Sequence, residues 1–278
     1  MGISTNSIFH FTNSKDTLKS ILKDGGFKIT YCLEMFELDK GRLEAAIPMV
    51  SFSDIPLSKV ETHLNKYGKY AIALSKKWAA KNGLNPVIYM QKQSTCAAMM
   101  EPLIIDTFNN DPYGKITIRY TLKKVDEHNH EMNDVFNGDR ANKINSLIGT
   151  LSFIKNHDGD LYRNNVLKQK NYRFYDEREW RYVPMYNDFD KVHLSYDPFM
   201  HKDEYYQWRD KTKRKEFLPD LLLRFDASDI EYILTKNDAE INNTIQLLSK
   251  FKHLYSSEKE YRILISKIFS CEKIFNDI

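Results

Sequence analysis

The sequence predicts an α+β fold, in which helices cover a β-sheet without alternating regularly with its strands. Short runs rich in β-branched and aromatic residues recur along the 278 residues, and segments with helical spacing of apolar residues lie between them. No regular strand-helix-strand rhythm connects these segments, unlike in a doubly wound parallel sheet. The length leaves open one large domain or a domain with an elaborated cap, and either can bury a full core. We expect a single domain over residues 1–278.

The first third of the chain carries clear local signals. Residues 7–11 predict a strand, Asn13 and Ser14 offer N-caps for the helix that follows, and glycines at positions 25 and 26 end that helix. The other elements expected in this part are strands over 49–53, 71–74 and 86–90 and helices over 57–66 and 75–83.

The middle of the chain changes in character. Residues 94–170 predict a helical and polar insertion, because helical spacing over 94–108 and 142–154 flanks a polar stretch over 124–142. After it we expect strands over 191–194, 221–225 and 230–234 and helices over 203–217 and 238–251. The last helix belongs to a C-terminal helical extension over about 236–278.

Composition argues against several functional classes. The formal charge is only +3, from 41 basic and 38 acidic residues, so the chain lacks the overall field of a dedicated duplex-DNA binder. A basic and aromatic stretch over 205–215 is able to track a phosphate backbone, although a solvated helix face gives the same pattern. Three widely spaced cysteines predict no disulfide framework. Without a secretory signal or a long apolar run, we expect a cytoplasmic protein with no membrane contact.

Two carboxylates stand two residues apart in the strand-like run over 175–184. Glu177 and Glu179 are therefore expected on one face of a strand. Arg178 and Arg181 can neutralise them as surface ion pairs, which is a purely structural use. Two acids held in different surroundings also suit work on a developing positive charge, which is a catalytic use.

The same spacing of two recurs in three strand-like segments, so we expect their polar side chains to point into one shared cleft. A single histidine or serine at such a position is more often a hydrogen-bonded structural residue. The candidate site therefore depends on the combination, whose members are His10, Thr12, Ser51, Ser53, Glu177 and Glu179.

Four short segments, over 9–12, 50–57, 174–184 and 223–233, resemble the bacterial abortive-infection family AbiGi. The resemblance extends over residues 7–235, and its longest segment is the most specific. It implies a role in phage defence. Because this family name has been attached to the antitoxin side of a two-gene system, the resemblance also implies a cognate toxin or antitoxin partner.

The order of histidine, Ser-x-Ser and Glu-x-Glu is also similar to that of the ADP-ribosyltransferase superfamily. This resemblance implies a split β-core, surrounded by helices, that binds NAD as a substrate. It implies that Glu179 is the catalytic acid and that Glu177 acts on the acceptor. The implied NAD-binding residues are His10, Thr12, Ser51 and Ser53. Phe52 departs from the pattern, since threonine is expected between the two serines.

Stacking and charge add further candidates. Nicotinamide is flat, so Tyr67 and Tyr70 are candidate stacking partners, with core packing as the alternative. Lys155 can contact a phosphate or simply end a helix. The sequence contains neither a Rossmann nor a P-loop motif. We expect no metal site, because the histidines and glutamate within 128–131 lack a second spaced pair.

Three functions remain open from the sequence. The first is an NAD-dependent ADP-ribosyltransferase that acts as a phage-defence effector on a nucleic-acid or protein acceptor. The second is a non-catalytic antitoxin or binding component of a toxin-antitoxin system. The third is an NAD glycohydrolase, in which water replaces the acceptor.

Overall fold

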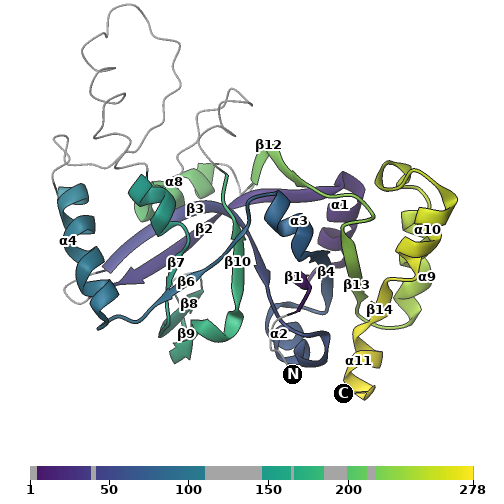
Figure 1. Cartoon of the computed structure of the whole chain (residues 1–278), viewed down its shortest axis with the longest axis horizontal. Helices are drawn as coiled ribbons and strands as arrows, with labels where there is room; N and C mark the ends of the chain where they lie inside the picture. Colours follow the sequence, from purple (N-terminus) through teal and green to yellow (C-terminus); the bar gives the residue numbers. More distant parts are fainter. Residues whose placement is uncertain are drawn as a thin grey trace, which may run out of the picture.

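A sheet of ten strands, counted among the residues that the structure describes, forms the centre of the molecule (Figure 1). The computed structural model describes residues 5–38, 42–109, 146–163, 166–184, 199–211 and 217–277. The polar stretch expected over 124–142, with its residues 128–131, and the strand expected over 191–194 lie outside these ranges.

The strands of the sheet are β1 (Ser7–Thr12), β2 (Gly26–Glu37), β3 (Arg42–Ser53), β4 (Tyr70–Ser75), β5 (Asn85–Pro86), β10 (Glu179–Tyr182), β11 (Met200–His201), β12 (Phe217–Arg224), β13 (Ile230–Thr235) and β14 (Ile268–Ser270). Two separate two-stranded sheets pair β6 (Ile88–Met90) with β7 (Ile154–Asn156) and β8 (Asp158–Arg163) with β9 (Val166–Arg173).

The helices are α1 (Lys15–Asp24), α2 (Glu61–Tyr67), α3 (Lys76–Lys81), α4 (Thr95–Asn109), α8 (Lys202–Lys211), α9 (Ala239–Leu248), α10 (Glu258–Ile265) and α11 (Cys271–Asp277). Short 3₁₀ turns are η1 (Leu57–Lys59), η2 (Phe174–Glu177) and η3 (Lys252–Leu254), and residues 146–151 are also helical.

Strand β3 links two parts of the sheet because its partners change along its length. Residues 42–49 pair with β2, and residues 50–53 pair with β10. Ser53 also lies opposite Phe9 of β1. The strand order is β12-β2-β3-β1-β4-β13-β14, and β14 runs parallel to β13.

The pairing register fixes which side chains share a face of the sheet, since residues directly opposite in an antiparallel pair point to the same side. Ser53 lies opposite both Phe9 and Glu179, so these three share one side, which we call the polar face. His10 and Phe52 are the next residues along their strands and point to the other side, which we call the aromatic face.

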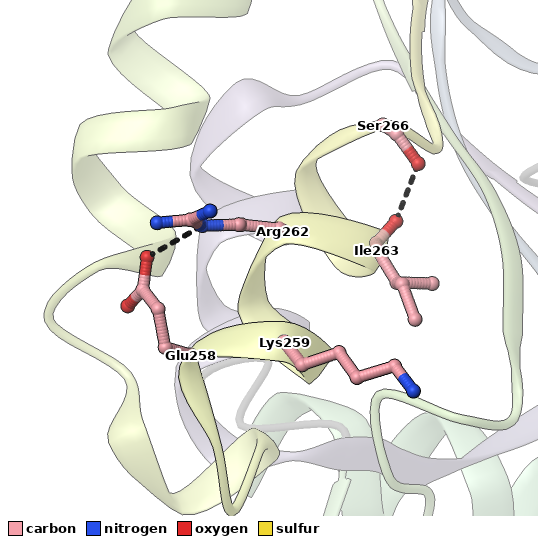
Figure 2. Close-up of a pocket in the computed structure, with 5 residues that line it drawn as sticks. All are labelled: Glu258, Lys259, Arg262, Ile263 and Ser266. Atoms are coloured by element: carbon pink, nitrogen blue, oxygen red, sulfur yellow. Dashed lines mark hydrogen bonds and ion pairs between the residues drawn. The ribbon is translucent and has the colours of Figure 1, made fainter.

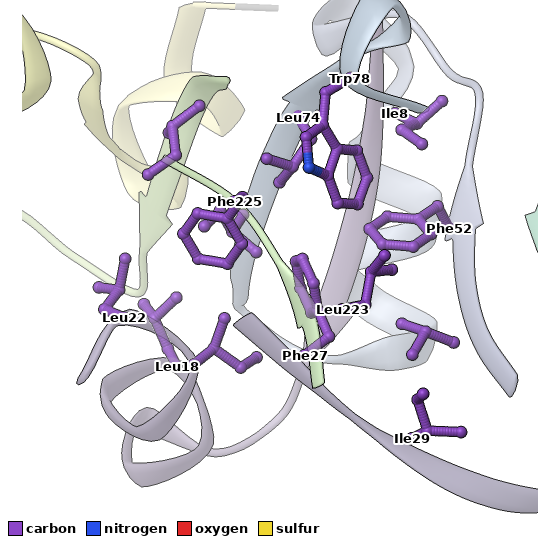
Figure 3. Packing of buried hydrophobic residues seen from close by; sticks show 14 of the residues in the cluster. Ile8, Leu18, Leu22, Phe27, Ile29, Phe52, Leu74, Trp78, Leu223 and Phe225 are labelled. Atoms are coloured by element: carbon purple, nitrogen blue, oxygen red, sulfur yellow. The ribbon is translucent and has the colours of Figure 1, made fainter. Parts of the chain in front are cut away.

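The aromatic face carries an extensive hydrophobic core (Figure 3). The ring centroids of Phe27 and Phe52 lie 5.1 Å apart, and those of Phe52 and Trp78 lie 5.6 Å apart. The indole Nε1 of Trp78 donates a hydrogen bond of 2.9 Å to the carbonyl oxygen of Arg224. Large aromatic rings bury much apolar area, and this bond satisfies the one polar atom of the indole.

Local sequence signals explain where the first helices begin and end. Ser14 caps α1 by accepting a hydrogen bond of 3.3 Å from the amide of Thr17, and Gly25 ends the helix with a φ of 60°. Ser75 accepts a hydrogen bond of 3.1 Å from the amide of Trp78 at the start of α3. Of the two predicted caps for α1, Ser14 is confirmed, and Ser75 caps α3 in the same way.

The α+β class is confirmed, while two segments differ in content from the prediction. The expected helical insertion over 94–170 contains the strands β7, β8 and β9 as well as α4. The expected helical extension over 236–278 contains β14, which joins the sheet. The long strand β2 was not predicted, although its buried Phe27, Ile29 and Tyr31 alternate with the polar Lys28 and Thr30. No helix in the described ranges is long and apolar enough to span a membrane.

Candidate functional site

The carboxylate of Glu179 lies at the centre of a buried charge network on the polar face. Its Oε1 accepts hydrogen bonds from Ser51 Oγ at 2.7 Å and from Arg181 Nε at 2.8 Å. Its Oε2 accepts from Lys155 Nζ at 2.9 Å and from Arg181 Nη2 at 3.2 Å. Burial alone raises the pKa of Glu179, but Arg181 and Lys155 outweigh it and hold the pKa far below its usual range.

Arg181 supplies the opposite charge from within the same strand. Strand alternation places it on the face of Glu179, and its side chain is 0% exposed. The guanidinium also lies 2.9 Å from Glu34 Oε2 and donates a hydrogen bond of 2.9 Å to the carbonyl of Ser152. Two carboxylates and a carbonyl therefore satisfy this buried cation, which is the condition for its stability away from water.

Lys155, in β7, joins the two glutamates. Its Nζ lies 2.8 Å from Glu177 Oε2 and 2.9 Å from Glu179 Oε2. Burial lowers the pKa of Lys155, but Glu179 and the other nearby carboxylates outweigh that effect and raise it well above its usual value. The expectation of an exposed lysine at a helix end is wrong, because the residue lies on a strand with only 14% of its side chain exposed.

Glu177 reaches the network by a route that differs from the predicted strand. It ends the 3₁₀ turn η2, and Arg178 follows with a left-handed φ of 47° before β10 begins. The Glu177 Oε1 accepts from Tyr67 Oη at 2.6 Å and lies 3.1 Å from Lys66 Nζ. Burial raises the pKa of Glu177, but Lys155 and the hydrogen bond from Tyr67 outweigh it and bring the pKa to about 2.

His10 and Thr12 do not share a face with the two glutamates. Both belong to the aromatic face, where the ring of His10 lies against Phe27 and Phe52 at centroid distances of 5.0 and 5.6 Å. His10 Nδ1 donates a hydrogen bond of 2.9 Å to the main-chain carbonyl of Ser51, and burial lowers its pKa. The expectation of one shared cleft is therefore wrong for His10 and Thr12, because β1 presents alternate residues to opposite sides of the sheet.

The structure separates the two candidate stacking tyrosines. Tyr67 contacts Glu177 and belongs to the network. Tyr70 lies opposite Thr12 on the aromatic face, and its hydroxyl donates to Glu240 at 3.2 Å. Ser53 is buried on the polar face directly opposite Glu179. A role for any of these residues in NAD binding stays a prediction.

Several members of the network were missed or misplaced by the sequence reasoning. Arg181 pairs with Glu179 as anticipated, but in the interior rather than at the surface. Arg178 instead donates from Nε to the carbonyl of Asp54 at 2.8 Å. Glu34 was not predicted, because only the folded sheet brings it within reach of Arg181. In the described part of the chain, no group of three potential metal ligands was found.

A separate surface hollow lies on α10 (Figure 2). Its lining residues are Glu258, Lys259, Arg262, Ile263 and Ser266. Glu258 and Arg262 pair with each other at 3.1 Å across one turn of the helix, with most of both side chains in solvent. None of the predicted site residues lines this hollow.

The fold and the site define an α+β protein organised around a buried network of carboxylates and bases. The family model described as "Putative abortive phage resistance protein AbiGi, antitoxin" matches residues 26–236, and the chain belongs to this family. It is 28% identical over 242 residues to the abortive phage resistance protein AbiGi of Lactococcus lactis subsp. cremoris, an alignment that covers 83% of this chain and 88% of that protein. No solved structure matches the chain.

Proposed function

We propose that this protein acts as the antitoxin of an abortive phage resistance system and works by binding a toxin protein. The family description supports the assignment. The main structural support for the antitoxin assignment is the bonding of Glu179, because both of its carboxylate oxygens accept hydrogen bonds from side chains of the same molecule. This arrangement is typical of a residue that holds a fold together.

The electrostatics of the network also disfavour the transferase mechanism. Cleavage of the bond between nicotinamide and ribose builds positive charge on the ribose ring, and a carboxylate must be available to stabilise it. Here Lys155 and Arg181 already neutralise Glu179 at distances of 2.9 and 2.8 Å. Glu34 and Glu177 balance these two cations in turn, so every carboxylate of the network is already paired with a cation of the same molecule.

ADP-ribosyl transfer to a nucleic-acid or protein acceptor is the second candidate, and one observation favours it. The hydroxyl of Ser51 donates to Glu179 at 2.7 Å, so these two residues lie together, as the superfamily resemblance implies for members of one site. In this mechanism NAD is the substrate, Glu179 faces the ribose, and Glu177 acts on the acceptor.

Growth assays test the antitoxin proposal directly. We would express the chain alone, the product of the neighbouring gene alone, and both together in a bacterial host. The expected result is that the chain is harmless, that the neighbouring product stops growth, and that the pair grows. Growth arrest by this chain alone, with no protection by it, would refute the proposal.

Purified protein incubated with labelled NAD and bacterial extract tests the transferase candidate. We expect neither labelled acceptor nor loss of NAD. If label is transferred, Glu179→Gln should abolish the transfer, whereas Glu258→Gln, which alters an exposed acid on α10, should leave it unchanged. Loss of NAD without a labelled acceptor would instead indicate a glycohydrolase.

A further inference from the structure

The hairpin formed by β8 and β9 is unusually exposed. Every residue of β9 except Tyr172 is classed as exposed, and within the described ranges neither strand pairs with a third. An isolated two-stranded hairpin is at best marginally stable in water. The feature therefore needs support from its base or from a bound partner.

The base of the hairpin is fixed to the charge network. Tyr172, near the end of β9, accepts a hydrogen bond from Lys66 of α2, and the same lysine contacts Glu177. The ring of Tyr172 lies edge-on to Phe174 at a centroid distance of 5.0 Å. These contacts hold the base and leave the outer half of the hairpin uncovered.

The outer half presents apolar side chains to solvent. Tyr162 and Leu167 lie directly opposite each other on the two strands and are 37% and 38% exposed. Val166 is 53% exposed. Val166 precedes Leu167 in β9 and therefore points to the opposite face of the hairpin. Single exposed apolar residues are ordinary, but apolar side chains exposed on both faces of one projecting hairpin are typical of an interaction surface.

The charge that the hairpin leaves uncompensated is positive. Lys168 and Lys170 are exposed and form no ion pair within the part of the chain that the structure describes. By sequence the hairpin's two acids, Asp158 and Asp160, are outnumbered by its four basic residues, Arg163, Lys168, Lys170 and Arg173. A partner that covers this surface must therefore supply negative charge beside an apolar patch.

Strand addition to the hairpin edge is disfavoured. The register of β8 with β9 shifts at two places, and Asn171 has a left-handed φ of 50°. Irregularities of this kind, together with lysines, are devices by which proteins block pairing at a sheet edge. Recognition must then use side chains rather than main-chain hydrogen bonds.

We infer that the outer half of the β8–β9 hairpin is the surface that binds the toxin, through an acidic and apolar segment of that protein. The inference rests on the proposed antitoxin function. A protein partner fits better than a nucleic acid, because the centre of the surface is apolar and two lysines neutralise little of a phosphate backbone.

The test compares two triple variants of the full chain. The hairpin variant is Leu167→Asp/Lys168→Glu/Lys170→Glu. The control variant, with the same kinds of change near and on α10, is Lys250→Glu/Lys252→Glu/Ile263→Asp, in which Ile263 is 47% exposed. Binding to the purified toxin is measured by titration, and rescue of growth is measured by co-expression. We expect the hairpin variant to bind about 30-fold or more weakly and to lose rescue, while the control variant keeps both.

The outcomes separate the two proposals. If the wild-type chain rescues growth and both variants rescue equally well, the hairpin inference is wrong and the antitoxin function stands. If the wild-type chain does not rescue growth, the antitoxin function and the hairpin inference are both wrong. Circular dichroism of the variants checks folding, and a photo-crosslinking residue at Val166 gives an independent measurement. A crosslink to the toxin supports the inference, and a crosslink only to nucleic acid or to a second copy of the chain overturns it.

Discussion

Lys155→Met probes the buried charge network more sharply than any other single change. The substitution keeps most of the side-chain volume and removes the one cation shared by Glu177 and Glu179, at 2.8 and 2.9 Å. Breaking a buried ion pair by removal of one partner costs about 3–5 kcal/mol, because the other charge stays buried and uncompensated. We therefore expect the free energy of unfolding at pH 7 to fall by about that amount.

The pKa of Glu177 reports the net stabilisation of its charged form by Lys155 and the other groups around it. Its value moves from 4.5 to about 2 on folding, which corresponds to about 3 kcal/mol at pH 7. Because the pKa is lower in the folded state, this stabilisation is present above about pH 4.5 and is lost as the pH falls through about 2. The difference between wild type and Lys155→Met should thus shrink when the pH is lowered from 5 towards 2.

Urea unfolding followed by circular dichroism measures both the free energy of unfolding at pH 7 and its change with pH. Lys15→Met is the matched control, since Lys15 is 48% exposed and its pair with Glu240 should contribute only about 0–1 kcal/mol. Adding Glu177→Gln to Lys155→Met should recover part of the loss, because it removes one uncompensated charge. A loss below about 1 kcal/mol for Lys155→Met, with no dependence on pH, would refute the account of the network.

Three further changes test other parts of the structure. Ser51→Ala removes a hydrogen bond of 2.7 Å to the charged Glu179, and urea unfolding should show a loss of about 1.5–3 kcal/mol. Gly68→Ala should lower the melting temperature strongly, because its φ is 125° and an added Cβ would lie 2.3 Å from the main chain of Asn13; an unchanged melting temperature would contradict this geometry. In the native protein the exposed Cys96 should react quickly with a thiol reagent, the half-buried Cys32 slowly, and the buried Cys271 only after unfolding, because burial raises the pKa of the last two to about 11; equally rapid reaction of all three would contradict this order.

The sequence predicted secondary structure best where a local signal decides it. Ser14 and Gly25 define the ends of α1 by capping chemistry, which needs no information from the rest of the chain. It was harder to predict from the sequence which face of the sheet each strand residue occupies. A period of two shows that His10 and Thr12 share a face, but only the pairing register of β1 with β3 shows that this face is opposite to that of Ser51.

The two acids show both the value and the limit of local reasoning. Glu177 and Glu179 do lie in one network, as their spacing suggested, although the left-handed turn at Arg178 brings them there instead of a continuous strand. Glu34 and Lys155 could not be assigned to it, because their contacts join segments more than twenty residues away in sequence and depend on the assembled sheet.

The wide separation of the network's members along the chain bears on how the protein is made. Glu34 leaves the ribosome about 150 residues before Arg181, its buried counter-charge. During that interval the carboxylate of Glu34 stays hydrated, because the final packing around it would bury a charge without Arg181 beside it. The segment around Glu34 therefore reaches its final packing only after β10 has been synthesised. A polypeptide that stops before residue 179 lacks both the Glu179 carboxylate and the Arg181 guanidinium of the buried network.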